Sequence, residues 1–421
     1  MNNENQHIPV GYKSSPLGII PEDWEVKRLG EVCSFLRNNT LSRNQLNETS
    51  GKVQNVHYGD ILVKYPSILN ARTESIPYVN QADYKDTLNE FIEDGDVIMA
   101  DTAEDETVGK ACEIINVDSK RIIAGLHTML LRPQKGLFAS SFLGYHINSN
   151  SYRKQLNALM QGIKVCSLGK QVIANTFLLF PPLPEQQRIV SLLSFWDTAI
   201  AKQSALIEKL ILRKKGLMQQ LLTGKKRLKG FEGEWKEVRL GEIATFFSGG
   251  TPKSSNKSYY NGDIPFIRSG EIDKNKTELF ISQEGINNSS AKIVEKGDIL
   301  YALYGATSGQ CSMSKIRGAI NQAILCIKPN ANRYFIMSVL QLNKENYYNS
   351  YLQGGQGNLS GEIVSNYIIP IPTNEEQNAI ASVLIQADKE IELADEKLTR
   401  LQEQKKGLMQ VLLTGKKRII I

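Results

Sequence analysis

The chain has 421 residues, too many for one ordinary domain, and 41% are hydrophobic and 22% charged, the usual balance of a globular protein with buried cores. The polar N-terminal segment has no apolar signal-peptide stretch, and no run of about 18 apolar residues could cross a membrane. We therefore expect a cytoplasmic protein. The five cysteines are scattered without a CxxC pair, which predicts reduced thiols and argues against disulfides and a metal site.

The net charge of +6 is modest, but basic residues gather in two segments. Residues 209–230 contain eight Lys or Arg and no acid, and residues 397–421 contain seven against Glu403 alone. Such clusters suit phosphates or an acidic partner surface. Basic residues near helix C-termini also complement the helix dipole while staying in solvent. The sequence alone leaves both interpretations open.

The first half contains short apolar or alternating segments bounded by turn residues, which is typical of an α/β domain. Residues 97–99 and 129–133 predict strands, and residues 138–161 predict helix. The Phe-Pro-Pro-Leu segment at 180–183 faintly resembles a methyltransferase loop. It lacks the polar first residue of that loop, so we interpret it as a strand end that leads into the next helix.

A long helix is predicted at the end of the first half. Steps of alternating four and three residues from Ile189 give an apolar seam with a period of 3.5 residues over five heptads, which indicates a coiled coil. Pro184 just before the helix and Gly224 just after it are typical start and stop signals. The apolar seam residues are Ile189, Leu193, Trp196, Ile200, Ile207, Leu210, Leu217 and Leu221.

The second half follows the same order. Residues 299–301 and 325–329 predict strands, residues 333–353 predict helix, and a second long helix ends the chain. Lys214 and Lys405 interrupt the two seams at the same place; each fixes the helix register, or extends its charge into solvent at a fraying helix end. The apolar seam residues of the second helix include Ile380, Leu384, Ile391, Leu398, Leu401, Leu408 and Leu412.

The two halves are copies of one unit. Residues 214–227 return as residues 405–418 with 13 of 14 identities, at an offset of 191. Trp24 and residues 29–32 return as Trp235 and residues 240–243, at an offset of 211, so the first half has about 20 more residues between these landmarks. Between the landmarks the copies diverge strongly. Each copy is therefore a fixed frame around a variable insert.

These patterns predict an α/β (α+β) protein with a pseudo-two-fold internal repeat. We expect two domains of mixed sheet plus helices, separated by two long antiparallel coiled-coil helices. The predicted divisions are residues 1–183, 184–230, 231–372 and 373–421, as first domain, first helix with linker, second domain and second helix. Four leucines lie off the seam, and they either contact partner subunits or pack under the adjoining domains: Leu192, Leu206, Leu212 and Leu222.

Catalytic motifs are missing from the sequence. No GxxxxGK[ST] phosphate loop or HExxH motif occurs, and the four histidines are dispersed. Asp96, Glu106 and Lys110 could form a nuclease-like set, but the acidic stretch 101–106 is better interpreted as a solvated loop.

Polar loops suited to nucleic acid are present in both inserts. They lie at residues 37–40, 55–58 and 161–164, and at residues 248–253, 304–310 and 353–358. Asn and Gln can pair with adenine, and Arg or Lys with guanine, although Gly/Ser/Asn loops are also ordinary turns. The candidate DNA-binding residues are Arg37, Asn38, His57, Tyr58, Lys164, Thr251, Lys253, Arg268, Tyr304, Thr307, Gln310, Gln353 and Gln356.

Over nearly its whole length the chain resembles the specificity subunits of type I restriction–modification systems. The resemblance rests on residues 11–31, residues 181–189, residues 297–300 and the repeated Lys-Lys-Gly-Leu-Met-Gln…Leu-Leu-Thr-Gly ending. The second helix entry, residues 372–377, departs from the first copy but keeps Glu-Gln. The base-reading residues of this family follow no motif, so the candidates above come from the loops alone.

The resemblance implies a non-catalytic subunit of an adenine-N6 DNA methyltransferase and restriction complex. It implies two target-recognition domains, each reading half of a bipartite DNA site. It also implies two methyltransferase subunits that hold S-adenosylmethionine, and translocase–nuclease subunits that hold ATP and Mg, so we expect no cofactor and no metal on this chain. The alternative is an interaction scaffold with two ligand-binding domains on a coiled-coil stalk.

Overall fold

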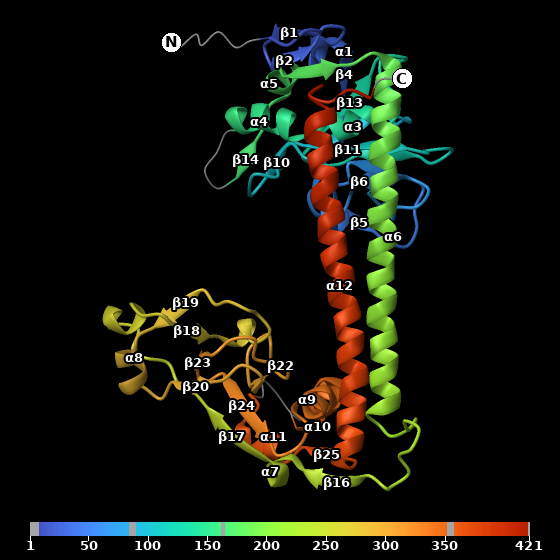
Figure 1. Ribbon diagram of the computed structural model, residues 1–421. Coiled ribbons are helices and arrows are strands. Elements are labelled where there is room, and N and C mark those ends of the chain that lie inside the picture. Colours follow the sequence, from blue (N-terminus) through green and yellow to red (C-terminus); the bar gives the residue numbers. More distant parts are fainter. Residues whose placement is uncertain (1–7, 84–89, 161–164, 352–357, 420–421) are drawn as a thin grey trace. The chain divides into compact units, whose positions relative to one another are not determined.

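A computed structural model describes residues 8–83, 90–160, 165–351 and 358–419 (Figure 1). Its contacts divide the chain into two compact units. Unit 1 comprises residues 1–203 and 397–421, and unit 2 comprises residues 204–396. Each unit holds one variable insert, which we call head 1 (residues 12–180) and head 2 (residues 236–371). Each unit also holds the beginning of one long helix and the end of the other.

Head 1 consists of short elements, because its apolar runs are only a few residues long and end at Gly, Pro, Asn or Asp. Its strands are β1 (Tyr12–Ser15), β2 (Gly18–Pro21), β3 (Glu25–Arg28), β4 (Cys33–Leu36), β5 (Leu46–Asn47), β6 (Gln54–Val56), β7 (Ile68–Asn70), β8 (Tyr78–Val79), β9 (Val97–Ala100), β10 (Thr102–Ala103), β11 (Ala111–Ile115), β12 (Ile122–Ala124), β13 (Thr128–Pro133), β14 (Cys166–Ser167) and β15 (Phe177–Phe180). Its helices are α1 (Leu29–Val32), η1 (Arg43–Gln45), α2 (Tyr58–Val63), α3 (Phe142–Ile147), α4 (Asn150–Leu159) and α5 (Lys170–Ala174).

Two sheets form the body of head 1. The larger has the order β4-β13-β9-β11-β7 and the smaller the order β12-β6-β8-β5. Strand β9 is apolar throughout because both of its faces are covered. Val97 and Met99 pack into one core cluster, and Ile98 and Ala100 into another. The predicted strands of this half are confirmed, and the predicted helix at 138–161 is two short helices, α3 and α4.

Head 2 repeats this plan with fewer strands. Its strands are β16 (Lys236–Arg239), β17 (Ala244–Ser248), β18 (Ile264–Ile267), β19 (Leu279–Ile281), β20 (Lys292–Val294), β21 (Ile299–Ala302), β22 (Cys311–Met313), β23 (Gly318–Ile320), β24 (Ile324–Pro329) and β25 (Ile368–Ile371). Its helices are α7 (Leu240–Ile243), η2 (Lys257–Tyr260), η3 (Ser269–Glu271), α8 (Gln283–Asn287), α9 (Arg333–Leu342), α10 (Lys344–Tyr351) and α11 (Gly361–Ser365).

The sheet orders show that the two heads share one topology. In head 2 the order β17-β24-β21-β22 matches β4-β13-β9-β11, and the parallel pair β18–β23 matches β6–β12. Strand β7, which is parallel to β11, lies at the edge of the head 1 sheet, and the described part of head 2 has no strand in that place. Part of the additional sequence of the first half therefore forms this edge. The helix predicted at 333–353 is again two helices, α9 and α10.

The two long helices are α6 (Leu183–Leu221) and α12 (Asn374–Leu412), each of 39 residues. Every predicted seam residue of both helices is buried or half-buried, so the 3.5-residue pattern is the packed face. Gly224 and Gly415 follow the helices with φ of +69°, a left-handed conformation that glycine adopts without steric cost and that ends a helix.

Both units show that the helices run antiparallel. In unit 1, Lys405 near the end of α12 contacts Asp197 near the beginning of α6. In unit 2, Lys214 near the end of α6 contacts Asp388 near the beginning of α12. The two lysine side chains are only 15% and 18% exposed. The register interpretation therefore describes both seam lysines, and they do not extend into solvent.

A second pair of frame contacts joins the helices to the entry segments of the heads. In unit 1 the buried Glu185 carboxylate accepts hydrogen bonds from Trp24 Nε1 (2.9 Å) and Arg418 Nε (2.7 Å). Arg418 also contacts Asp23 at 2.8 Å, and these hydrogen bonds raise the pKa of the guanidinium.

Unit 2 repeats the arrangement around Glu376. Its carboxylate accepts hydrogen bonds from Trp235 Nε1 (3.2 Å) and Arg227 Nε (2.6 Å). Arg227 and Arg418 of the two basic clusters are thus engaged inside their own units, as are Lys214 and Lys405, which neither of the two interpretations of the clusters anticipated. The division of the chain into heads and helices at residues 183, 230 and 372 stays a prediction. The two units are defined by contacts, and the boundary between them falls inside both long helices.

Candidate nucleic-acid interface

The strand register of head 1 separates a loop end from a frame end of its larger sheet. Thr128 lies opposite Ala100, and Leu130 lies opposite Leu36, so the loops after β4, after β9 and before β13 all leave from the same end. The other end reaches α6, where Gln186 accepts a backbone hydrogen bond from the segment after β13 (2.9 Å). We call the end with the three loops the loop end, and the end that reaches α6 the frame end. Head 2 has the same two ends.

Three aromatic rings meet at the loop end of head 1. The His57 and Tyr58 rings lie 4.6 Å apart, and the Tyr58 and His127 rings lie 5.3 Å apart at 81°. His57 follows β6 and caps α2, because its Nδ1 accepts the Gly59 N–H at 3.2 Å. Burial lowers the pKa of His57, which agrees with a neutral ring that accepts this bond.

His127 faces two polar residues at the end of β9. Its Nδ1 lies 3.6 Å from Asp101 Oδ1 and 3.5 Å from the Thr102 hydroxyl, which itself donates to Asp101 Oδ1 at 2.8 Å. The side chain of His127 is 47% exposed, and its φ is +53°, a conformation rare outside glycine. The Asp101 N–H donates to the His127 carbonyl at 3.0 Å, which ties the two loops together.

Asparagine side chains hold the loop that precedes His127. Asn38 Nδ2 donates to the Gly125 carbonyl (3.2 Å), and Asn39 Nδ2 donates to the Ala124 carbonyl (2.6 Å). Asn55 Nδ2 donates to Asn39 Oδ1 at 3.1 Å, and its own buried Oδ1 has no partner in the described part of the chain. The predicted site residue Asn38 is thus a support of the loop.

The loop end of head 2 carries a different polar pair. The Thr251 hydroxyl donates to Gln322 Oε1 at 2.6 Å, and both side chains are exposed. Gly249 lets the chain pass β23, because a Cβ at this position would lie 1.8 Å from the Ile320 carbonyl oxygen. Thr251 therefore has a defined partner, which gives one exposed amide a fixed orientation.

Backbone hydrogen bonds show which residues of the two heads correspond at the loop end. The Leu303 N–H donates to the Ala323 carbonyl at 2.8 Å, as the Asp101 N–H donates to the His127 carbonyl. The same backbone positions therefore carry an acid and an imidazole in head 1 but two apolar side chains in head 2.

Arg268 occupies the place in head 2 that His57 occupies in head 1, directly after the strand that pairs in parallel with its neighbour. Its guanidinium contacts Glu271 at 3.2 Å and also Glu278. The hydrogen bonds that the guanidinium donates to these carboxylates, first to Glu271, raise the pKa of Arg268. Two acids therefore hold this side chain in the isolated protein.

The remaining candidates fall on the same loops or outside the described residues. Arg37, Lys253 and Gln310 are exposed at the loop ends, and Tyr304 and Thr307 are half-buried there. The other predicted residues, Lys164, Gln353 and Gln356, lie outside the described part of the chain. No observation tests whether these residues touch DNA, so their roles stay predictions.

Three residues that the fold brings to the loop ends are not among the candidates predicted from the sequence: Asp101, His127 and Gln322. In the sequence, Asp101 belongs to an acidic stretch that predicts a solvated loop, and His127 is one of four dispersed histidines. The available signal was position, since both residues flank predicted strands and antiparallel pairing would bring those strand ends together.

The nuclease-like set does not assemble. Asp96 is buried at the frame end, where its carboxylate pairs with Arg132 at 2.7 Å. The Lys110 ammonium donates to the Leu62 carbonyl at 2.9 Å, and Glu106 is exposed. Phe180 ends β15 directly before α6, as the strand-end interpretation of that segment predicted.

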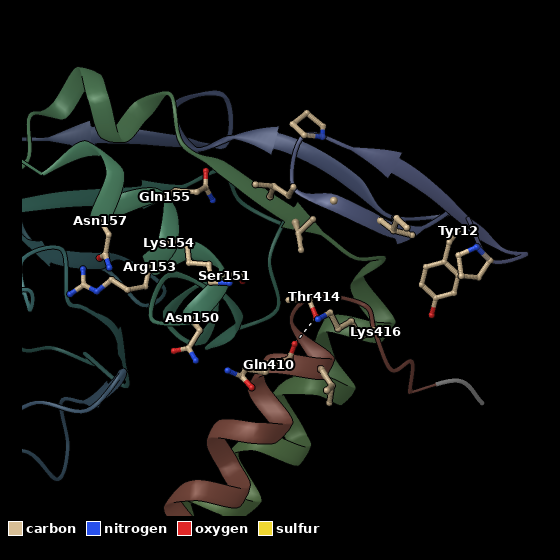
Figure 2. A pocket seen from close by; sticks show the side chains of 17 residues that line it. Tyr12, Asn150, Ser151, Arg153, Lys154, Gln155, Asn157, Gln410, Thr414 and Lys416 are labelled. Carbon is tan, nitrogen blue, oxygen red and sulfur yellow. Dashed lines mark hydrogen bonds between the residues drawn. The ribbon is translucent and has the colours of Figure 1, made fainter. Parts of the chain in front are cut away.

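One hollow of unit 1 lies away from the loop end. It has a volume of about 1210 Å³ and is lined by the β1–β2 hairpin, α4 and the last turns of α12. Figure 2 shows Tyr12, Asn150, Gln410 and Lys416 around it. Its lining comes largely from head 1 and also from the end of α12, and it includes none of the candidate DNA-binding residues.

In the described ranges, no group of three or more His, Cys, Asp or Glu side chains could hold a metal ion, and no helix has the length and apolar character to span a bilayer. All five cysteines are free, and four are buried, as the sequence predicted.

A family model described as "Type I restriction modification DNA specificity domain" matches residues 21–210 and again residues 232–403. The two matches coincide with the two copies of the repeat. The chain belongs to this family. The type I specificity family thus accounts for most of the chain, and the predicted resemblance is confirmed.

Similar proteins match the chain over nearly its full length. The chain is 25% identical over 429 residues to a putative type I restriction enzyme MjaX specificity subunit of Methanocaldococcus jannaschii, covering 97% of each. A chain solved in work on complex assembly and conformational transition of the type I R-M system matches with a TM-score of 0.62 at 20% identity, over 94% of this chain and 99% of that one. The type I S subunit from M. genitalium matches with a TM-score of 0.53 at 15% identity, over 92% and 96%. These structures share the fold of this chain.

Proposed function

We propose that the chain is the DNA-reading, non-catalytic subunit of a type I restriction–modification complex, acting in the cytoplasm. Each head would read one half of a bipartite, asymmetric DNA site through its loop end. Membership of the specificity family supports this proposal, and so does the name of the relative from M. jannaschii.

The observation that carries the proposal is the contrast between the two ends of each head. At the frame end the contacts are repeated: Glu185 and Glu376 each bind a Trp and an Arg, and Asp197 and Asp388 each bind a Lys and a Tyr. At the loop end the same backbone carries different side chains. Such a design keeps the assembly constant while allowing the two heads to recognise different sequences.

The catalytic groups would come from partner subunits. We propose that methyltransferase subunits supply S-adenosylmethionine and that restriction subunits supply ATP and Mg. The exposed apolar side chains of the long helices support a protein-binding surface there, since exposed apolar patches often mark sites of protein interaction. The strongest examples are Phe195 at 70%, Leu212 at 69%, Leu393 at 56% and Ile211 at 52% exposed.

Two measurements on the purified chain test the proposal. Binding to duplex DNA should weaken steeply with salt, because phosphate neutralisation releases counterions. Addition of S-adenosylmethionine and DNA without partner subunits should give no methyl transfer. Binding that does not depend on salt, as expected for the alternative scaffold that binds proteins or glycans, would contradict DNA reading, and methyl transfer by the chain alone would contradict the non-catalytic role.

A further inference from the structure

The cluster of Tyr58, Asp101 and His127 at the loop end of head 1 is built from three separate segments, the beginning of α2 and the loops that follow β9 and precede β13. Its Tyr58–His127 and Asp101–His127 distances, 5.3 Å between rings and 3.6 Å between polar atoms, bring the three side chains together. None of the repeated frame contacts requires them, because those lie at the other end of the sheet.

Neighbouring side chains hold the loop that carries His127 in place. The side chains of Asn38 and Asn39 donate hydrogen bonds to the loop before His127, and Thr128 Oγ1 donates to the Gly125 carbonyl at 2.6 Å. A Cβ on Gly125 would lie 2.5 Å from Asn55 Oδ1, so the loop is also packed closely. His127 has an uncommon backbone conformation, which these contacts hold in place. Such conformations cluster at functional sites, where a side chain needs a defined direction.

The His127 and Asp101 side chains are 47% and 26% exposed, so their free polar atoms are open to a ligand. Among the described residues, nothing bonds to His127 Nε2 or to the Tyr58 hydroxyl. Nε2 carries an N–H in the imidazolium and in one neutral tautomer, so His127 can donate a hydrogen bond there. Asp101 Oδ1 accepts the Thr102 hydroxyl, and Oδ2 has no partner in the described ranges.

A carboxylate on a DNA-reading surface restricts what it can face. It is repelled by phosphates and by the acceptor atoms of guanine and thymine, and it is favourable only against an exocyclic amine. Cytosine presents N4–H₂ alone on its major-groove edge, whereas adenine places the N7 acceptor beside its amine. The guanine paired with that cytosine presents O6 and N7, which accept from an N–H donor such as His127.

We propose that Tyr58, Asp101 and His127 form the base-reading centre of head 1 and that they recognise one G·C pair, with Asp101 accepting from cytosine N4–H₂ and His127 donating to guanine. The tyrosine ring packs against His127 and holds the imidazole edge-on. This inference rests on the proposed function. Head 2 has Leu303 and Ala323 at the corresponding positions and reads its half-site by other groups.

The test is methylation mapping by the chain assembled with its methyltransferase subunits on a library of half-site variants. Asp101→Asn keeps the acceptor for Thr102 and the side-chain shape, but it adds an amide N–H that can donate to adenine N7 while the amide oxygen accepts from adenine N6. It should lower the preference for C over A at one position of one half-site by roughly 5- to 150-fold. His127→Ala should relax the same position, and the other half-site should keep its specificity, which also shows that the variant is folded.

Glu104→Gln is the matched control, since Glu104 is an exposed acid on the same loop without a contact in the described chain. Glu104→Gln should change the affinity for DNA and leave the base preference unchanged. The wild-type complex could methylate a bipartite site while Asp101→Asn and His127→Ala leave every base preference intact. That outcome would overturn this inference but not the proposed function. A wild-type complex without site-specific methylation would contradict the proposed function itself.

Discussion

Lys405 of α12 pairs with Asp197 of α6, and the second oxygen of the same carboxylate accepts a hydrogen bond from the Tyr145 hydroxyl of head 1 at 2.6 Å. One carboxylate thereby joins both long helices to the head of unit 1. Asp388, Lys214 and Tyr334 repeat the arrangement in unit 2. A polar contact inside an apolar seam fixes the register at which two helices can pair.

Reversing the charge of Lys405 should therefore destabilise unit 1. In Lys405→Glu two carboxylates face each other in a half-buried seam, and we expect a loss of about 1–2 kcal/mol in the free energy of unfolding. Adding Asp197→Lys should recover at least half of it, because the pair is restored in reverse. Urea denaturation measures the free energy of unfolding of both variants.

The control for this pair is Lys406→Glu, since Lys406 is exposed and next in sequence. Equal losses for Lys405→Glu and Lys406→Glu would mean that the seam contact does not fix the register.

A buried histidine shows how the two copies have diverged at two positions together. His146 Nε2 accepts the Leu179 N–H at 2.9 Å. The corresponding residues in unit 2 are Phe335, which follows Tyr334 as His146 follows Tyr145, and Pro370, which pairs with β16 as Leu179 pairs with β3. Proline has no N–H, so no acceptor is needed there.

This correspondence predicts a coupled pair. His146→Phe alone should cost about 1–3 kcal/mol, because it leaves the Leu179 N–H buried without a partner. The double variant His146→Phe with Leu179→Pro should be less destabilised than the sum of the two single variants. A double-mutant cycle by thermal denaturation measures the coupling, and strict additivity would contradict it.

The same histidine gives unit 1 a pH dependence. Burial lowers the pKa of His146 from 6.5 to about 4, so the folded state binds its proton less readily than the unfolded chain. The associated stability is complete above pH 6.5 and is lost as the pH falls towards 4, by up to about 3 kcal/mol. Melting temperatures of wild type and His146→Phe should converge over this interval on acidification. A constant difference between them would exclude the mechanism.

The off-seam leucines now separate into two kinds. Leu222 is buried in the core of unit 2 and Leu192 packs against the core of unit 1, whereas Leu212 and Leu206 are exposed. Leu212→Asp should weaken co-purification with methyltransferase subunits and leave the melting temperature of the chain unchanged. Leu222→Asp should lower the melting temperature, since it places an unpaired charge in a core. Intact assembly of the Leu212→Asp chain would show that this surface binds no partner.

The sequence predicted the long helices, their antiparallel pairing and the duplication, because a heptad seam and a repeated segment are local patterns. It also predicted the central strands, since 97–99 and 299–301 are apolar runs. It did not reveal the partners of Lys405 or Glu185, which lie far away in sequence. Asp101 and His127 were missed for the same reason: strand register brings them together, and neither residue belongs to a motif.

The central claim is that two independent reading heads are set in one repeated frame. The most direct test replaces residues 231–370 with the corresponding insert of another family member, keeps both long helices, and maps DNA methylation by the assembled complex. Our account predicts that one half of the recognised site changes completely and that the half read by head 1 stays the same. A change in both halves, or in neither, by a folded and active complex would contradict it.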